Sequence, residues 1–218
     1  MAGNQQENIE VSSLARKVRK GWIAAVLAGG FAFAIPAQAQ FSDGYKLLEA
    51  VKKLDGTKVT DMLADPSISV NTRDITTGET ALHIVVQKRN NVWIQFLTQK
   101  GANPNIADVH GTTPLMVAAN LGFVDGVASL IAAGARVDTP NDTGETPLIS
   151  AVHRRDVAMV RTLLKAGANP DRADNSGRSA RDYAALDGRQ SPVLSAIEEA
   201  IKAKAAVGAS KSFGPSLP

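Results

Sequence analysis

Residues 111–138 read GTTPLMVAANLGFVDGVASLIAAGARVD and contain two short apolar segments, each preceded by a turn. Thr113 is suited to cap the first predicted helix, and Pro114 fits the first helical position because no backbone donor is needed there. The second predicted helix runs over residues 124–132, and Gly134 follows it at the position where helices often end in a left-handed residue. Helices this short cannot bury their apolar faces alone, so the stretch predicts a helix-turn-helix unit that packs against neighbours.

The chain supplies such neighbours, because the same pattern recurs every 33 residues. Turn glycines, helix leucines and helix-end glycines all keep this spacing, and agreement across so many positions indicates a repeat array. The recurring residues include Gly78, Gly111, Gly144 and Gly177, then Leu82, Leu115 and Leu148, and also Gly101, Gly134 and Gly167. We expect each first helix to pack on the second helix of its own unit and on both adjacent units, which builds one continuous core.

The composition limits the classes of function that the chain can serve. Of its 218 residues, 44 % are hydrophobic and 5 % are aromatic, which predicts an aliphatic core. The formal net charge is +3, too small for the broad basic surface of a nucleic-acid-binding domain, so no nucleic-acid partner is expected. The chain has no cysteine, which excludes disulfides, thiol catalysis and cysteine-ligated metal sites.

These units resemble the ankyrin repeat. Residues 111–138 and the stretch GETPLISAVHRRDVAMVRTLLKAGANPD at 144–171 match that family's pattern closely, whereas GETALHIVVQKRNNVWIQFLTQKGANPN at 78–105 is a looser match. The resemblance implies an all-α ankyrin-repeat solenoid of about five stacked helix-turn-helix units with β-turn or hairpin tips. The expected boundaries are an N-terminal capping repeat at 41–75, interior repeats at 76–108, 109–141 and 142–174, a C-terminal capping repeat at 175–204, and a disordered tail at 205–218.

The first 39 residues have the features of a signal peptide. Four cations lie between residues 16 and 20, and the uncharged run Trp22–Ile35 follows them. At about 1.5 Å per residue this run spans roughly 21 Å as a helix, short of a bilayer core of about 30 Å. The small-x-small motif before Gln40 predicts cleavage by signal peptidase between Ala39 and Gln40. A retained membrane anchor over the same run is the alternative.

The sequence contains no recognisable catalytic or metal-binding motif. His83 occupies a position where the ankyrin family uses histidine structurally, to join a loop to a helix by hydrogen bonds. His110 and His153 have no partner at metal-ligand spacing, so neither a metal nor another cofactor is expected. Asp108 and Asp174 lie in turns, where a carboxylate commonly accepts bonds from nearby backbone. The sequence therefore predicts a protein that is not an enzyme.

The resemblance also implies where a partner would bind, since ankyrin-like arrays generally bind other proteins through the turn tips and the adjoining ends of the first helices. The tip candidates are Thr77, Glu79, Val109, His110, Thr112, Asp142, Glu145 and Arg178, and the helix-end candidates are Lys88, Arg89, Asn120, Leu121, His153 and Arg154. Paired cations at three of four helix ends predict a basic track that would bind an acidic segment of a partner. Alternatively, these cations only complement the helix dipole.

These features together predict a monomeric, non-catalytic protein–protein interaction module exported to the bacterial periplasm. It would be free of the membrane after signal cleavage, and it would serve as an accessory or protective partner of a periplasmic enzyme. Two alternatives remain open at this point. One is a membrane-tethered scaffold that keeps its N-terminal anchor, and the other is a secreted effector that binds a host protein.

Overall fold

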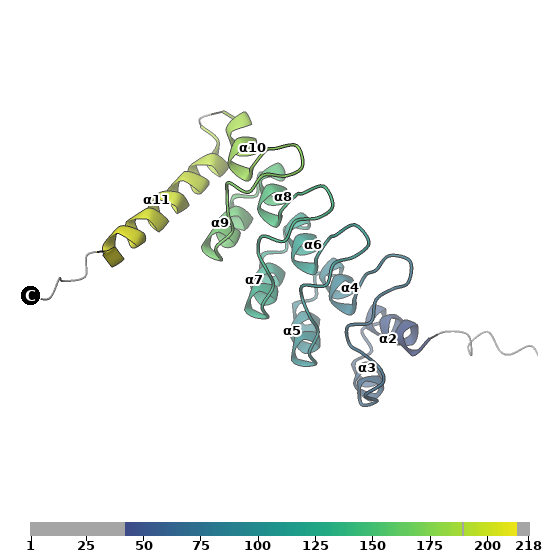
Figure 1. Ribbon diagram of the computed structural model, residues 1–218. Coiled ribbons are helices and arrows are strands. Elements are labelled where there is room, and N and C mark those ends of the chain that lie inside the picture. Colours follow the sequence, from purple (N-terminus) through teal and green to yellow (C-terminus); the bar gives the residue numbers. More distant parts are fainter. Residues whose placement is uncertain (1–41, 189, 213–218) are drawn as a thin grey trace, which may run out of the picture. The chain divides into compact units, whose positions relative to one another are not determined.

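The computed structural model describes residues 42–188 and 190–212, in which ten helices form five successive pairs (Figure 1). They are α2 (Asp43–Lys52), α3 (Gly56–Leu63), α4 (Ala81–Gln87), α5 (Asn91–Gln99), α6 (Pro114–Asn120), α7 (Val124–Ala132), α8 (Pro147–His153), α9 (Val157–Lys165), α10 (Ala180–Leu186) and α11 (Pro192–Ser212). This confirms the predicted all-α repeat array. The predicted signal segment 1–39 and its cleavage site at Ala39 and Gln40 lie outside the described residues.

The first helices begin where the turn chemistry predicts. The Thr113 hydroxyl accepts a hydrogen bond from the Met116 amide at 3.3 Å, and Pro114 occupies the first position of α6. The Thr146 hydroxyl repeats this cap on α8 by accepting from the Ile149 amide at 3.2 Å. Each cap satisfies a donor that the helix leaves free at its start, which stabilises a helix of about two turns.

The core is continuous along the array because each interior first helix, α4, α6 or α8, has three helical neighbours. α6 packs on α7 of its own repeat and on α4 and α8 of the adjacent repeats. Leu115, Leu148 and Leu163 have no exposed surface, and the alanine pair Ala118–Ala119 lets the neighbouring helices approach closely. No repeat could bury these side chains by itself, so the stability of each repeat depends on its neighbours.

The tips, which are the turns that precede the first helices, are joined by backbone hydrogen bonds from one repeat to the next. We call these three bonds the tip ladder. The amides of Val109, Asp142 and Asn175 donate to the carbonyls of Thr77, His110 and Thr143 at 3.0, 3.1 and 3.1 Å. The three donor residues are 33 apart, and so are the three acceptor residues, so the ladder fixes successive tips in one register.

His83 is buried and joins its helix to a loop by hydrogen bonds, as the family resemblance implies, and this loop belongs to the next repeat. Its Nδ1 accepts a hydrogen bond from the Thr80 amide at 3.0 Å, which leaves the proton on Nε2. Nε2 lies 2.9 Å from the Thr112 carbonyl of the next tip and donates to it. Burial lowers the pKa of His83 below its ordinary value of 6.5, although the bond to Thr112 opposes this effect.

The lowered pKa of His83 predicts that the array is less stable in mild acid. The unfolded chain binds a proton at His83 more readily than the folded chain, so this contribution is fully present above pH 6.5 and is lost as the pH falls below it. We expect the free energy of unfolding to fall by at most about 1.4 kcal/mol per pH unit in this range. Urea unfolding between pH 8 and pH 5 measures the slope. The exposed His110→Ala variant should retain it, and His83→Gln should lose it.

The last helix differs from the prediction for the C-terminal tail. α11 continues to Ser212, so the expected disorder is wrong for residues 205–212, while 213–218 lie outside the described residues. Alanine and lysine are strong helix formers, and the first proline that could stop the helix is Pro215. Among the described residues, no helix is both long enough and apolar enough to cross a bilayer.

Candidate functional site

The fourteen residues predicted to bind a partner lie in two rows of the array. Eight are in the tips and six are at the ends of α4, α6 and α8 or directly after them, and Figure 1 places the tip loops side by side along the array. Every one of these side chains is exposed or half-buried. The structure therefore makes this surface accessible to a partner, and the role of the individual residues in binding stays a prediction.

Each tip is held in a fixed conformation by one side chain. Asp108 Oδ1 accepts hydrogen bonds from the amides of His110 and Thr112, both at 2.8 Å. Asn141 and Asp174 make the equivalent bonds in the next two tips. Such local bonds are the role predicted from the sequence for the two aspartates. Because the loops are ordered before a partner arrives, binding would not require them to fold.

The first tip contains one more residue between Asp74 and Thr80 than the later tips have over the same turn. The additional length places Ile75 at the tip with its side chain fully exposed, at 101 % of its reference area. Val109 in the following tip is 51 % exposed. This end of the surface is therefore more apolar than the rest.

The tips are tied to the first helices by side-chain contacts at equivalent positions. Gln87 donates to Glu79 at 2.5 Å, and His153 Nδ1 lies 3.3 Å from Glu145 Oε1. The middle repeat has Asn120 in this row, and its side chain accepts a hydrogen bond from the Ser150 hydroxyl. The two rows of candidate residues consequently form one surface.

An aromatic and polar cluster lies at the C-terminal end of this surface. The rings of His153 and Tyr183 meet edge to face, with centroids 4.5 Å apart and an angle of 75° between the planes. The Tyr183 hydroxyl donates to Asp174 Oδ2 at 2.6 Å, and the Ser176 hydroxyl donates to Oδ1 at 2.7 Å. The bond from Tyr183 is the main reason that the pKa of Asp174 is far below its usual value. Arg178 lies 5.9 Å from the centre of the Tyr183 ring.

The cluster borders a hollow of about 440 Å³. Three carboxylates, a histidine and a tyrosine contribute to its wall, and the lining residues are Asp142, Thr143, Glu145, His153, Asp174, Asn175, Ser176 and Tyr183. Tyr183 is not among the site residues predicted from the sequence. Ser150 on α8 bonds to the candidate residue Asn120, and Tyr183 lies 33 residues after Ser150, at the equivalent position of the next repeat. The repeat spacing could therefore have identified Tyr183.

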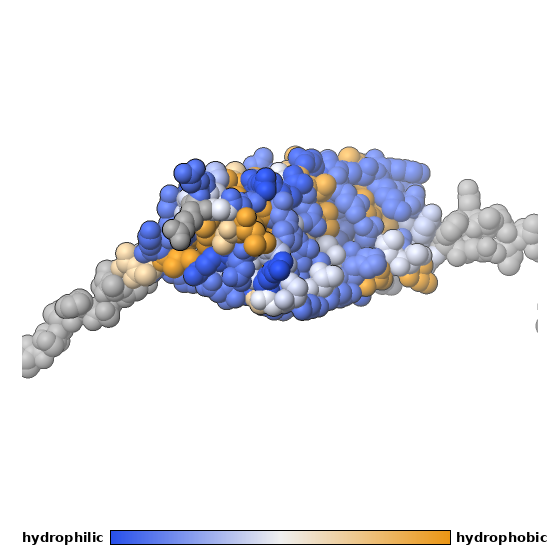
Figure 2. All heavy atoms as spheres, turned by 90° about the horizontal axis from the view of Figure 1, so that it is seen from above, coloured by the Kyte–Doolittle hydropathy of each residue, from blue (hydrophilic) through white to orange (hydrophobic). Residues whose placement is uncertain are grey.

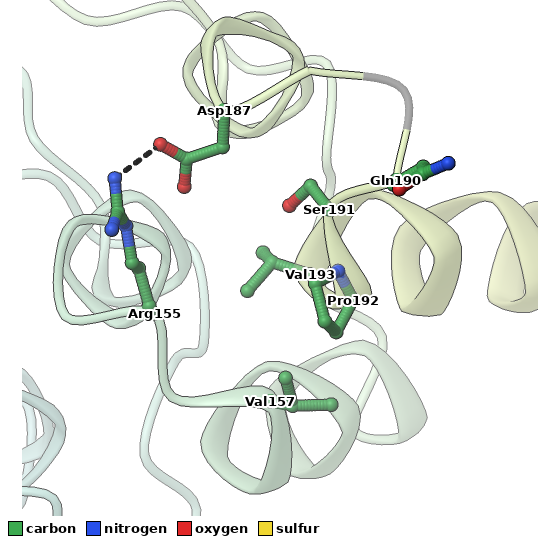
Figure 3. A pocket seen from close by; sticks show the side chains of 7 residues that line it. All are labelled: Arg155, Val157, Asp187, Gln190, Ser191, Pro192 and Val193. Atoms are coloured by element: carbon green, nitrogen blue, oxygen red, sulfur yellow. Dashed lines mark hydrogen bonds and ion pairs between the residues drawn. The ribbon is translucent and has the colours of Figure 1, made fainter.

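The paired cations at the helix ends do not form a continuous free track. The Arg89 guanidinium donates to the carbonyl of Leu121 in the next repeat. Arg155 makes the corresponding reach and pairs with Asp187 at 2.5 Å, as Figure 3 shows. These two arginines connect repeats, whereas Lys88 and Arg154 form no ion pair within the described residues.

A second hollow, of about 370 Å³, lies beside this ion pair between the α8–α9 turn and the start of α11 (Figure 3). Val157, Pro192 and Val193 form its apolar part. Three of its four polar side chains already have partners within the protein, since Arg155 binds Asp187 and the Ser191 hydroxyl accepts a hydrogen bond from the Leu194 amide at 3.3 Å. The hollow therefore offers a ligand little polar recognition.

Within residues 42–188 and 190–212, no three side chains of histidine, aspartate or glutamate gather closely enough to hold a metal ion. The carboxylates of the tips are used instead to order backbone amides. What the geometry provides is an ordered, accessible surface with mixed charge.

Comparison with known proteins agrees with this architecture. The chain matches the family described as ankyrin repeats (3 copies) over residues 45–141 and the family described as ankyrin repeats (many copies) over residues 130–184. Together these matches extend from within α2 to within α10.

Three curated relatives show the same likeness. The chain is 32 % identical over 96 residues to the ankyrin repeat protein YahD of Escherichia coli, a match that covers 42 % of this chain and 48 % of the relative. It is 31 % identical over 78 residues to the ankyrin repeat protein FPV031 of fowlpox virus, covering 36 % and 23 %. It is 32 % identical over 94 residues to the nuclear factor NF-kappa-B p105 subunit of Gallus gallus, covering 43 % and 10 %.

The matches thus span less than half the length of each of these relatives, so the likeness concerns the repeats and not the activities of the whole proteins. The 33-residue period, the capped first helices, the glycine-ended second helices and the tip ladder are all present in the structure. From its repeats, this chain belongs to the ankyrin repeat family.

Proposed function

We propose that this chain is a non-catalytic module that binds its partner on the surface formed by the tips and the ends of the first helices. Its ankyrin repeats are protein–protein interaction modules. The observation that carries the proposal is the tip ladder, which aligns exposed side chains of successive repeats on one ordered surface. A surface that is ordered in advance binds with a smaller loss of conformational entropy than flexible loops would.

The chemistry of the surface favours a partner that presents both signs of charge. Lys88 and Arg154 are exposed cations without an ion pair in the described residues, and they could contact an acidic segment. The carboxylates of Asp142 and Glu145 line the hollow beside Tyr183, where a basic side chain would find both charge and an aromatic face. The basic track predicted from the sequence is therefore replaced by two separate basic contacts, at Lys88 and Arg154.

Reversing the two free cations should weaken the complex without weakening the fold. We expect the Lys88→Glu, Arg154→Glu double variant to bind the partner at least tenfold less tightly, because both charges lie on the proposed contact surface. Affinity capture with the tagged chain identifies the partner, and calorimetry with that purified partner then measures the change. The Gln95→Ala variant, on the exposed side of α5, is the matched control and should bind normally.

The result that contradicts this assignment is an unchanged affinity for the double variant with an unchanged unfolding curve. A loss of affinity in Gln95→Ala that equals the loss in the double variant would also contradict it, since α5 belongs to the row of second helices. Arg89 and Arg155 are left in place in this design because their side chains contact the next repeat.

We further propose that the module is exported to the bacterial periplasm, where it serves as an accessory or protective partner of an enzyme. The support is the cation cluster, the short apolar run and the small-x-small motif that end at Ala39. Intact-mass analysis of the chain isolated from the periplasm should give a mass that begins at Gln40. A full-length mass in the membrane fraction would favour a tethered scaffold, and recovery from the culture medium would favour a secreted effector.

A further inference from the structure

α11 is built differently from the other second helices. The helices α3, α5, α7 and α9 have 8 or 9 residues, whereas α11 has 21. Its first half packs on α9 in the way that second helices pack on their neighbours, through the buried side chains of Val193, Ala196 and Ile197. Figure 1 shows that α11 then continues beyond the stacked pairs. Within residues 42–188 and 190–212 no further repeat packs on α11, so the helix carries a face that these residues leave uncovered.

An open groove lies where α11 passes the end of α9. Its volume is about 410 Å³, and it lies between the segment that ends α9 and one turn of α11. Leu164, Ala168, Ala200, Ile201 and Ala203 supply most of the apolar wall. Ala168 is buried, Ala200 and Ile201 are half-buried, and Ala203 is exposed. Figure 2 shows hydrophobic residues gathered toward this end of the array, among largely hydrophilic ones.

The rim of the groove is positively charged. Lys165 and Lys204 line it, no aspartate or glutamate does, and neither lysine forms an ion pair within the described residues. The nearest carboxylate along α11 is Glu199, which pairs with Arg161 at 2.8 Å. After Glu199 the sequence contains three lysines and no acidic residue. Apolar surface and unpaired positive charge consequently lie side by side.

We infer that this groove binds an acidic amphipathic segment of a partner protein. Its apolar side chains would enter the hollow beside Ile201 and Ala203, and its carboxylates would pair with Lys165 and Lys204. A second copy of α11 is a poorer occupant, because it would bring its own lysines against those of the first copy and would add no carboxylate after Glu199. The groove is formed by second helices and lies apart from the tip surface, so this site is independent of the proposed function.

Two matched peptides test the inference on the full chain. Both are labelled helical peptides with leucines three and four residues apart, and the remaining positions are glutamate in one and lysine in the other. Fluorescence anisotropy should detect binding of the glutamate peptide, weaker binding at higher salt, and no binding of the lysine peptide. Absence of binding by the glutamate peptide, or equal binding by both peptides, overturns the inference.

Variants of the chain locate the binding. Ala203→Glu combined with Lys204→Glu changes two exposed residues of the groove and should reduce affinity for the glutamate peptide at least tenfold. Lys58 is an exposed lysine on α3, at the other end of the array, and forms no ion pair with another described residue, so Lys58→Glu should leave the affinity unchanged. If both variants bind the glutamate peptide equally well, the attraction is only to the general charge of the protein and the inference is wrong.

Two further measurements guard against misfolding and self-association. Amide chemical shifts of the unmodified chain should change at Ala168, Ala200 and Ala203 when the glutamate peptide is added, and changes confined to the tips would overturn the inference. Sedimentation without peptide should show a monomer. A dimer that the Ala203→Glu, Lys204→Glu variant abolishes would assign the groove to a second copy of the chain and overturn the partner proposed here.

Discussion

Replacing Leu148 by alanine should lower the free energy of unfolding by about 3–5 kcal/mol. Leu148 has no exposed surface and is the second residue of α8, which packs on α6, α9 and α10. Removal of its branched end leaves a cavity that the helices around it cannot fill by collapsing, because their caps and the tip ladder fix them in place. In a repeat array the loss also weakens the interfaces on both sides of the altered repeat.

Chemical denaturation followed by circular dichroism measures this change. The matched control is Val92→Ala on α5, since Val92 is 75 % exposed and its replacement should change stability by no more than about 0.5 kcal/mol. A loss for Leu148→Ala as small as the loss for Val92→Ala would mean that the core does not run continuously through the array. A transition that splits into two steps would show that the repeats on either side of α8 unfold separately.

The second large effect should come from adding a single methyl group to the tip ladder. Gly144 and Gly177 have the same φ of 80°, so alanine at either position incurs backbone strain of about 1–2 kcal/mol. At Gly144 the new Cβ would lie 2.6 Å from the Asn175 amide nitrogen and 2.5 Å from its side-chain oxygen, whereas at Gly177 it would have no neighbour within 4 Å. Gly144→Ala must therefore also displace the amide that donates to Thr143.

We expect Gly144→Ala to cost at least about 1 kcal/mol more than Gly177→Ala, which is the value of a backbone hydrogen bond and the contacts around it. Both variants have the same backbone strain, so it cancels when their losses of unfolding free energy are subtracted. The remaining difference measures the contact between repeats. Hydrogen exchange at the Asn175 amide provides a local readout, and its protection should fall in Gly144→Ala alone. Equal losses of stability, with equal protection of this amide, would show that the ladder adds nothing to the coupling of repeats.

Much of the fold was predictable because it follows from local chemistry repeated along the chain. Thr113 and Pro114 fix the start of α6, and Gly134, with φ of 88°, follows the end of α7. Such signals act within a few residues, so each can be recognised in the sequence. The buried role of His83 could be predicted only through the family resemblance, because its partner Thr112 is in the next repeat.

The features that sequence reasoning missed depend on geometry between repeats. Arg89 and Arg155 have the left-handed backbone expected of glycine, with φ of 51° and 54°, and this conformation directs their side chains to the next repeat. A count of charges cannot distinguish such an arginine from one that is free to bind a partner. The tail was misread for another reason, since the absence of an apolar period does not prevent helix formation by alanine and lysine.

The tip ladder also has a mechanical consequence. In each of its bonds the later repeat donates and the earlier repeat accepts, and each repeat touches only its neighbours. A force applied to the two ends of the stack must pass through every interface in turn, so the interfaces act as springs in series and the weakest one yields first. The array would lengthen by the loss of one repeat at a time, and repeats that remain folded would keep their part of the binding surface intact under load.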